Sequence, residues 1–308
     1  MTNGASKEAN ERFPTGIVGL DAILNGGALR GGIYIVQGAP GSGKTILGNQ
    51  ICFNAAAQGG SALYVTLLAE THARMIAHLS SMSFFDSDAI PDRVSYLGAF
   101  RVLEDEGLKA LLDLIRREVR GRKASVVVLD GMATIGQSVS SDLELKKFVH
   151  ELQTQAVFPN WTMFLLTNGA RNPLPYSPEY TMVDGLIEMR TRMIERRAVR
   201  FLQVHKLRGS DFFSGEHSFR ISGDGIVVFP RTEVLLNAPV LPARADVQKL
   251  TIGIESLDRI MDGGPCRHSV TVVLGRAGSG KTTLGLQFLG ECSQEEPGLL
   301  LGLNESPA

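Results

Sequence analysis

The chain has 308 residues, of which 44% are apolar and 20% are charged, and its formal net charge is −1. These values are typical of a globular α/β protein, and the near-neutral charge argues against a nucleic-acid or membrane partner. Three cysteines without metal-ligand spacing favour a reducing compartment over a disulfide framework. No apolar run reaches transmembrane length and residues 1–11 are polar, so we expect a cytoplasmic protein with a disordered lead-in.

Residues 13–27 are predicted to form a short helix between glycine turns, because Leu20, Ile23 and Leu24 have helical spacing. Residues 33–36, Ile-Tyr-Ile-Val, predict a buried strand. Residues 38–45 read Gly-Ala-Pro-Gly-Ser-Gly-Lys-Thr, which is the spacing of a phosphate-binding loop. A helix expected directly after this loop completes the strand, loop and helix that the motif requires.

Each part of this loop has a physical role in binding a nucleotide. Its glycines let successive backbone amides wrap closely around a polyphosphate at a helix N-terminus. Lys44 would reach the β- and γ-phosphates, and Thr45 would place its hydroxyl on Mg²⁺. The alternative is a glycine-rich turn with an exposed lysine. The binding residues predicted here are Gly38, Gly41, Ser42, Gly43, Lys44 and Thr45.

Strands and helices alternate after the loop, which is typical of a parallel doubly wound sheet. The expected strands are residues 62–68, 94–97, 125–130 and 162–168, and the expected helices are residues 70–82, 105–120 and 143–157. Beyond residue 178, short strands follow one another without helices. They are expected at residues 183–189, 199–207, 216–221 and 226–229, as an antiparallel extension at one edge of the sheet.

The phosphate-binding loop occurs a second time at residues 275–282, which is 237 positions after the first. The flanking residues repeat at the same offset, so that Gly16 matches Gly253 and Asp21 matches Asp258. A chance motif would not bring its flanks with it, and we infer a tandem duplication. The second set of predicted binding residues is Gly278, Ser279, Gly280, Lys281 and Thr282, with Thr282 on the metal.

The duplication predicts the domain organisation. Residues 12–237 form one complete nucleotide-binding unit, residues 238–247 form a proline-stiffened linker, and residues 248–308 form the incomplete N-terminal part of a second unit. The second unit includes only a first strand, the loop, a helix and an expected second strand. It therefore cannot close a parallel sheet with both faces covered.

Nucleotide hydrolysis also needs a metal ligand and a residue that activates water. Asp130 ends an all-apolar strand, where an aspartate would hold Mg²⁺ through water; capping of the turn before Gly131 is the alternative. Glu70 follows the strand at residues 62–68, at the carboxyl end of the sheet, and is the candidate for activating water. A helix-capping role for Glu70 is the alternative.

Positive charge for the transition state would come from Lys206 and Arg208, which alternate on a predicted strand and project from one face. A solvated edge strand is the alternative. Thr167 and Asn168, at the tip of a central strand, would sense the γ-phosphate, and an ordinary polar strand end is the alternative. The arginines between residues 190 and 200 are mixed with glutamates, which favours a subunit contact or solvent over DNA.

Together these segments resemble the motifs of the KaiC family of RecA-like ATPases. The resemblance rests on residues 15–21 with the glycine pair at 26–27, the first loop, Asp130, and residues 206–210 followed by residues 225–230. It implies a RecA-like P-loop fold, with a central mostly parallel sheet between helices and an antiparallel C-terminal extension. It also implies a hexameric ring with ATP and Mg²⁺ at the subunit interfaces.

In such a ring Lys44, Thr45 and Asp130 would act in cis, while Lys206 and Arg208 would reach the γ-phosphate of a neighbouring copy. The family's second copy can act as a Ser/Thr autokinase. Two residues depart from the family pattern: clock members place two adjacent glutamates where residues 67–71 offer only Glu70, and Phe212 replaces a frequent histidine.

The leading functional hypothesis is a slow ATPase whose ring is a signalling platform with an unknown protein partner. One alternative is a RecA- or RadA-like DNA-dependent ATPase, against which the near-neutral charge argues. Another is a nucleotide-binding scaffold that does not hydrolyse ATP.

Overall fold

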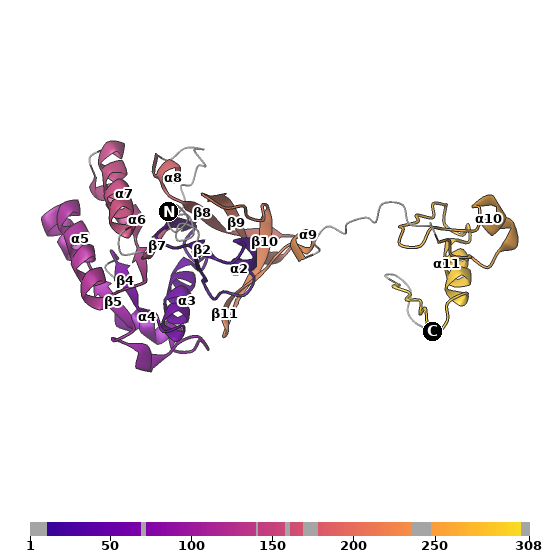
Figure 1. Ribbon diagram of the computed structural model, residues 1–308, viewed down its shortest axis with the longest axis horizontal. Helices are drawn as coiled ribbons and strands as arrows, with labels where there is room; N and C mark the ends of the chain where they lie inside the picture. The colour runs from indigo at the N-terminus through magenta and orange to yellow at the C-terminus, as the bar shows by residue number, and fades with distance from the viewer. Residues whose placement is uncertain are drawn as a thin grey trace, which may run out of the picture. The chain divides into compact units, whose positions relative to one another are not determined.

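The computed structural model describes residues 11–68, 72–139, 141–157, 161–168, 178–235 and 248–302. The chain divides into two units, Met1–Ala238 and Pro239–Ala308 (Figure 1). The division falls at the start of the linker expected at residues 238–247. In the described parts of both units, no helix has the length and apolar character needed to span a bilayer.

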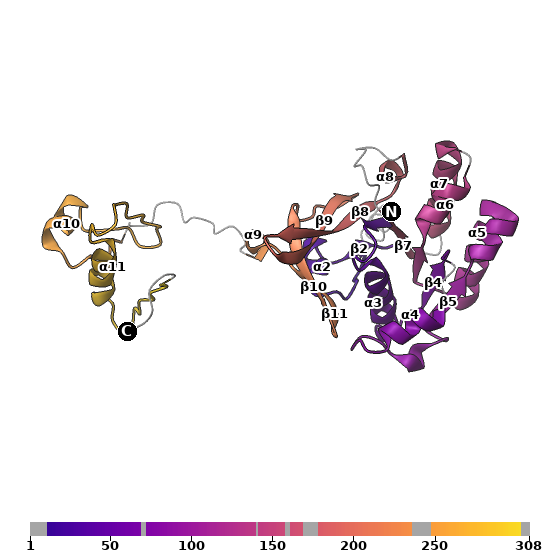
Figure 2. The same ribbon diagram turned by 180° about the vertical axis from the view of Figure 1, so that it is seen from behind.

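A nine-stranded sheet organises the first unit, in the order β11-β10-β9-β8-β3-β7-β6-β4-β5. Neighbouring strands from β5 across to β8 run parallel, and β8 to β11 are antiparallel (Figure 2). The strands are β3 (Ile33–Gly38), β4 (Ala62–Thr66), β5 (Val94–Gly98), β6 (Val126–Asp130), β7 (Thr162–Thr167), β8 (Gly185–Ile194), β9 (Arg197–Leu207), β10 (Glu216–Ser222) and β11 (Gly225–Phe229). The predicted fold class, a mostly parallel sheet with an antiparallel extension, is confirmed.

Helices α3 to α8 lie in the connections between the parallel strands, α2 precedes the sheet and α9 follows its last strand. The helices are α2 (Leu20–Ile23), α3 (Lys44–Ala57), α4 (His72–Leu79), α5 (Phe100–Arg122), α6 (Met132–Ser138), α7 (Asp142–Val157), α8 (Pro178–Met182) and α9 (Thr232–Leu235), with a 3-10 turn at Ser87–Ala89. A two-stranded sheet of β1 (Arg12–Phe13) and β2 (Ala28–Leu29) lies at the start of the unit. The helix expected at residues 105–120 begins earlier, because α5 combines two helices across Gly107, where φ is +80°.

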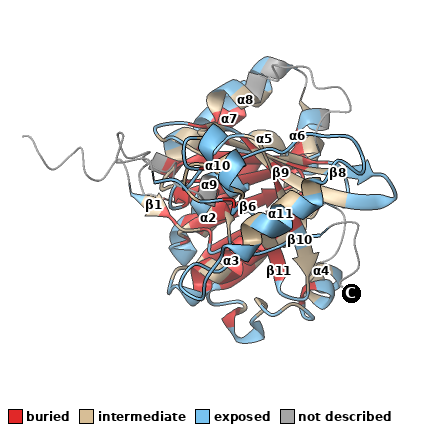
Figure 3. Cartoon of the chain, turned by 90° about the vertical axis from the view of Figure 1, so that its right-hand side faces the viewer, coloured by how far each residue is buried: buried red, intermediate tan, exposed pale blue. Residues whose placement is uncertain are grey.

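Two apolar clusters pack on opposite faces of the sheet, which explains why the central strands are apolar throughout. On β3, Tyr34 and Val36 join the cluster that contains α3, whereas Ile33 and Ile35 join the cluster that contains α5, α6 and α7. Figure 3 shows buried residues following the strands. Over β8 to β11 the α3 face is apolar, while the opposite face carries charged side chains such as Glu188.

The carboxylate of Asp21 fixes the turn of the entry segment, and Asn54 joins that turn to α3. The carboxylate accepts hydrogen bonds from the backbone N of Thr15 at 2.9 Å, the Thr15 hydroxyl at 2.6 Å and the backbone N of Gly16 at 2.9 Å. Asn54 of α3 donates to the backbone O of Thr15 at 3.0 Å. A Cβ on Gly16, where φ is +69°, would lie 2.7 Å from Asn54, so this turn requires glycine.

The second unit repeats this turn 237 positions later. Asp258 accepts hydrogen bonds from the backbone N of Ile252 at 2.8 Å and from the hydroxyl of Thr251 at 2.7 Å. Two helices follow, α10 (Glu255–Ile260) and α11 (Lys281–Gly290). The strand expected before the second loop is not formed: residues 269–274 pair with no strand among residues 248–302, and Val270 is 93% exposed.

Candidate functional site

The first phosphate-binding loop joins the end of β3 to the start of α3, and its backbone requires glycine at several positions. Gly41 has φ +77° and Gly43 has φ +103°, in the left-handed region that other residues rarely adopt. A Cβ on Gly38 would lie 2.5 Å from both the backbone O of Met189 and the hydroxyl of Ser42. The loop thus curves tightly at the N-terminus of α3, where backbone N–H groups bind anions.

Two side chains of the loop fit a polyphosphate. The Ser42 hydroxyl is buried and has no hydrogen-bond partner in the described part of the chain. Lys44, 8% exposed, folds its Nζ back to donate to the backbone O of Gly38 at 2.7 Å and of Ala39 at 3.1 Å. Burial lowers the pKa of Lys44, and the nearby Asp130 opposes that shift. A buried cation and an unpaired hydroxyl are the groups that phosphate oxygens would satisfy.

The predicted metal ligands lie together. Thr45, in the first turn of α3, donates from its hydroxyl to Oδ2 of Asp130 at 3.0 Å, and Asp130 ends β6 only 7% exposed. The described residues include no group of three or more His, Cys, Asp or Glu that would enclose a metal by themselves. One hydroxyl and one carboxylate beside a phosphate site fit Mg²⁺, which keeps several waters and binds substrate phosphates.

Tyr64 belongs to this cluster, and the sequence analysis did not identify it. Its hydroxyl donates to the same Oδ2 of Asp130 at 2.7 Å. Burial, followed by the charge of Asp130, raises the pKa of Tyr64 well above its ordinary value, so the phenol stays a donor at neutral pH. The sequence shows only a tyrosine within a strand that is predicted to be buried. Its contact with Asp130 could be predicted only by knowing that β4 pairs with β6.

A second hydrogen-bonded chain supports the other side of Thr45. Tyr96 of β5 donates to Oδ1 of Asn49 at 2.8 Å, and Nδ2 of Asn49 donates to the backbone O of Thr45 at 2.8 Å. The rings of Tyr64 and Tyr96 are 5.7 Å apart. The first turn of α3 is therefore held from β4, β5 and β6 together.

Thr167 and Asn168 lie at the carboxyl end of the central strand β7, the same end of the sheet as the loop that follows β3. Thr167 pairs with Gln37 in the register of β3 and β7, one residue before Gly38. Among the described residues, the Thr167 hydroxyl makes one long hydrogen bond of 3.5 Å, to the backbone O of Asn168. Their role in sensing the γ-phosphate stays a prediction.

Lys206 and Arg208 lie at the opposite end of the strands from the loop. Gly185 of β8 pairs with Tyr34 near the start of β3 and with Leu207 of β9, whereas Met189 pairs with Gly38 at the end of β3. Lys206 donates to the backbone O of Tyr180 at 3.1 Å and of Thr181 at 2.9 Å. Arg208 donates to the backbone O of Thr181 at 2.6 Å and of Met182 at 3.1 Å.

The two cations share one surface beside α8, and the charge of Arg208 acts on Lys206. Burial, followed by the charge of Arg208, lowers the pKa of Lys206, and Asp184 opposes that shift. Their hydrogen bonds go to backbone carbonyls at the end of α8, and no ion pair at either cation is found in the described ranges. The structure does not bring them to the loop of the same copy.

A family model described as "ATPase: KaiC" matches residues 13–233 and 250–308. The chain belongs to the KaiC family of ATPases. The circadian clock oscillator protein KaiC of Parathermosynechococcus lividus is 29% identical over 309 residues, covering 96% of this chain and 56% of that protein. The circadian clock protein KaiC2 of a Synechocystis species is 28% identical over 320 residues, covering 100% of this chain and 55% of that protein.

The chain thus spans just over half the length of these KaiC relatives. The crystal structure of a KaiC-like protein from the archaeon Pyrococcus horikoshii OT3 matches with a TM-score of 0.63 at 22% identity. That match covers 72% of this chain and all of the archaeal protein. The predicted resemblance to the KaiC family is confirmed, and the structural match supports the fold.

Glu70, the predicted water-activating residue of this KaiC-family chain, lies outside the described residues. The described chain stops at Leu68, just after β4, and resumes at His72, where α4 begins. The basic run near residue 190 is described: Arg192 donates to both carboxylate oxygens of Glu216 at 2.8 and 2.6 Å, and Arg190 pairs with Glu188 at 2.7 Å.

The second KaiC-type loop has part of the geometry of the first. Gly278 and Gly280 have φ of +76° and +86°, and Lys281 donates to the backbone O of Arg276 at 2.8 Å. Ser279 and Thr282 flank it in the same order as Ser42 and Thr45. Within residues 248–302, however, no carboxylate accepts a hydrogen bond from Thr282.

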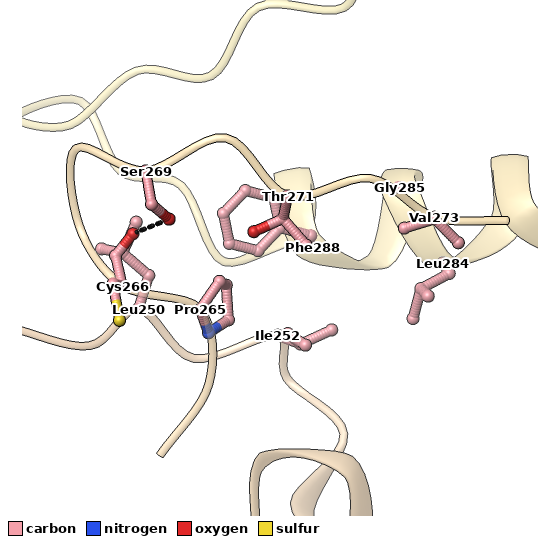
Figure 4. Close-up of a pocket in the computed structure, with 10 residues that line it drawn as sticks. All are labelled: Leu250, Ile252, Pro265, Cys266, Ser269, Thr271, Val273, Leu284, Gly285 and Phe288. Carbon is pink, nitrogen blue, oxygen red and sulfur yellow. Dashed lines mark hydrogen bonds between the residues drawn. The ribbon is translucent and has the colours of Figure 1, made fainter. Parts of the chain in front are cut away.

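An apolar hollow of about 310 Å³ lies beside α11 in the second unit (Figure 4). Six of its lining residues match buried core residues of the first unit at the offset of 237. The matched pairs are Leu250 with Phe13, Pro265 with Ala28, Thr271 with Tyr34, Val273 with Val36, Leu284 with Leu47, and Phe288 with Ile51. In the first unit the matching residues are part of the buried core between α3 and the sheet. The hollow therefore occupies the place of that core in the second unit.

Proposed function

We propose that the first unit binds ATP·Mg²⁺ and hydrolyses it at a site completed by a second copy of the chain. The observation that carries this proposal is the separation of two groups of functional side chains. Lys44, Thr45 and Asp130 gather at one end of the parallel strands, whereas Lys206 and Arg208 lie at the other end.

The residues around the first loop have complementary roles in the proposed site. The glycine backbone and Ser42 hold the phosphates, and Lys44 turns its ammonium from the carbonyls of the loop to the β- and γ-phosphates. Thr45 and Asp130 orient the metal, Asp130 through water. Mg²⁺ held there would neutralise charge on the phosphates.

The cations fit a trans role because of the strand register. From Tyr34 to Gly38 the chain advances four strand residues, about 13 Å, and the side chains of Lys206 and Arg208 lie beside the start of that span. They bond to carbonyls of α8 and stay solvent-accessible, so a neighbouring copy's nucleotide can compete for them. A surface that supplies the cations and a different surface that receives them form a heterologous contact, and such contacts form a ring when the rotation between copies closes.

Glu70 is proposed to orient or deprotonate the attacking water. The proposal rests on its sequence position shortly after β4, whose last residue Thr66 pairs with Asp130. We expect Glu70→Gln to bind ATP with nearly wild-type affinity and to lose turnover. Trace turnover that is equal in wild type and Glu70→Gln would instead favour the non-hydrolysing scaffold.

The ring is proposed to be a hexamer that serves as a signalling platform for an unidentified protein partner, as the resemblance to KaiC implies. A Ser/Thr autokinase activity stays a prediction for a full-length second domain, as the resemblance to KaiC implies. A DNA-dependent ATPase is less well supported, because Arg190 and Arg192 are paired with Glu188 and Glu216.

The test combines light scattering, with and without ATP·Mg²⁺, and phosphate release from wild type, Arg208→Ala and Arg116→Ala. Arg116 is an exposed arginine of α5 that pairs with Asp113, and it serves as the matched control. We expect ATP to drive a sixfold assembly, and Arg208→Ala to assemble but hydrolyse about a thousandfold more slowly. A monomeric wild type that hydrolyses ATP, with Arg208→Ala unaffected, would overturn the composite site.

A further inference from the structure

The carboxylate of Asp130 is held by two hydroxyl donors on a single oxygen. Thr45 reaches Oδ2 from α3 at 3.0 Å, and Tyr64 reaches it from β4 at 2.7 Å. Within the described ranges, no hydrogen bond goes to Oδ1. The two carboxylate oxygens therefore differ: Oδ2 accepts two hydrogen bonds, whereas Oδ1 accepts none from the described residues.

The Tyr64 hydroxyl has no evident role in packing. The ring is fully buried among apolar side chains and contacts Tyr96, and a phenylalanine ring would fill the same space. A hydroxyl in such surroundings costs free energy unless it is bonded. Its partner here is the carboxylate that the proposed site assigns to the metal, so the bond acts where the site needs a fixed orientation.

We propose that Tyr64 is a positioning residue, which fixes the Asp130 carboxylate so that Oδ2 stays toward Thr45 and Oδ1 is left to accept a hydrogen bond from water on Mg²⁺. This inference rests on the proposed ATP·Mg²⁺ site of the first unit. It gives the tyrosine an indirect role, because its hydroxyl bonds to the carboxylate of Asp130.

The geometry explains why two donors are needed. The terminal torsion of an aspartate is broad and roughly two-fold, so a carboxylate with one weak partner samples several orientations. A hydroxyl donor to a carboxylate forms a short, charge-assisted bond, and the tyrosine delivers it from a rigid ring in a packed core. Outer-shell partners of this kind typically change metal affinity by about 10- to 100-fold.

The test measures how strongly Mg²⁺ improves binding of a fluorescent non-hydrolysable ATP analogue to the full chain. Affinity is measured with Mg²⁺ titrated and with EDTA, for wild type, Tyr64→Phe and Tyr34→Phe. Tyr34 is the matched control, because it is a fully buried tyrosine of the same cluster whose hydroxyl bonds to Leu29. We expect the gain from Mg²⁺ to fall about tenfold in Tyr64→Phe only, with the EDTA affinities equal in all three.

The design also separates an effect on Asp130 from an effect on folding. In an Asp130→Asn background, Tyr64→Phe is expected to change the Mg²⁺ gain no further. If Tyr64→Phe does not fold, 4-aminophenylalanine at position 64 keeps a donor and is expected to keep the gain. 4-Fluorophenylalanine fills the volume without a donor and is expected to lose it.

Two outcomes overturn different claims. A folded Tyr64→Phe, or the 4-fluorophenylalanine variant, with the wild-type gain from Mg²⁺ would overturn the positioning role and leave the proposed function intact. A wild type that binds no nucleotide, or binds it without any gain from Mg²⁺, would contradict the proposed function itself.

Discussion

Replacing Gly43 by alanine tests whether the loop depends on its left-handed backbone. Gly43 precedes α3 with φ +103°, and an added Cβ would lie 2.6 Å from Cδ1 of Ile221. The left-handed conformation costs an L-residue about 1–2 kcal/mol, and displacing the flexible end of Ile221 adds about 1 kcal/mol. We therefore expect Gly43→Ala to lower the free energy of unfolding of the first unit by about 2–3 kcal/mol.

Gly41→Ala is the matched control. Gly41 also has a positive φ, +77°, but an added Cβ would meet nothing within 4 Å, so only the backbone cost of about 1–2 kcal/mol applies. Thermal denaturation resolves the difference, since each kcal/mol shifts the midpoint by about 2–4 °C in a unit of this size.

Nucleotide binding gives the second readout for Gly43→Ala. The affinity for a fluorescent ATP analogue is expected to fall by more than about tenfold, because the amide of residue 43 leaves the anion-binding nest. If Gly43→Ala unfolds no more readily than Gly41→Ala and binds nucleotide with wild-type affinity, the argument from the loop's geometry is refuted.

Three further predictions concern single side chains. Lys44→Met is expected to weaken nucleotide binding by about a hundredfold in calorimetry, while the free energy of unfolding stays within about 1 kcal/mol of wild type because burial already disfavours the ammonium. Asp21→Asn replaces one of the two carboxylate oxygens that accept three hydrogen bonds, and it is expected to lower the free energy of unfolding by about 1–3 kcal/mol in chemical denaturation. The control Asp113→Asn, at an exposed position, is expected to cost less than about 0.5 kcal/mol, and equal effects would contradict the role of the turn. Burial alone would raise the pKa of Glu188, but hydrogen bonds from Arg190 and His205 outweigh it and hold this pKa below its ordinary value. Because the folded pKa is lowered, the stability that Glu188 adds is complete above its unfolded pKa and is lost as pH falls through the folded pKa. The difference in free energy of unfolding between wild type and Glu188→Gln is therefore expected to shrink between about pH 5 and pH 3. A difference that stays constant with pH would refute this.

The loop and its neighbours were predictable from sequence because their chemistry is local. Residues 38–45 specify a glycine backbone, a lysine and a threonine within one turn, and the apolar runs on either side define β3 and α3. Asp130 was predictable as the end of an apolar strand. The antiparallel strands were also identifiable, because period-two patterning follows residue 183 without helical segments.

The remaining parts of the site depend on which strands are neighbours, and sequence spacing does not specify this. Tyr64 meets Asp130 only because β4 pairs with β6, across 66 positions of sequence. Lys206 and Arg208 were predicted as site residues. Their distance from the loop of their own copy follows only from the register of β3 with β8 and of β8 with β9, which sequence does not specify. The strand expected before the second loop shows the same limit, since an apolar run needs a neighbouring strand to pair with.

Subunit mixing tests most directly whether the site is shared between copies. Asp130→Asn disables the metal side of the loop and Arg208→Ala removes the trans cation, so each variant alone is expected to show almost no phosphate release. In an equal mixture about a quarter of the heterologous interfaces join an intact loop to an intact Arg208, and activity is expected to recover to about a quarter of wild type. Mixtures that form mixed rings, shown by mass, yet release no more phosphate than the separate variants would contradict the shared site.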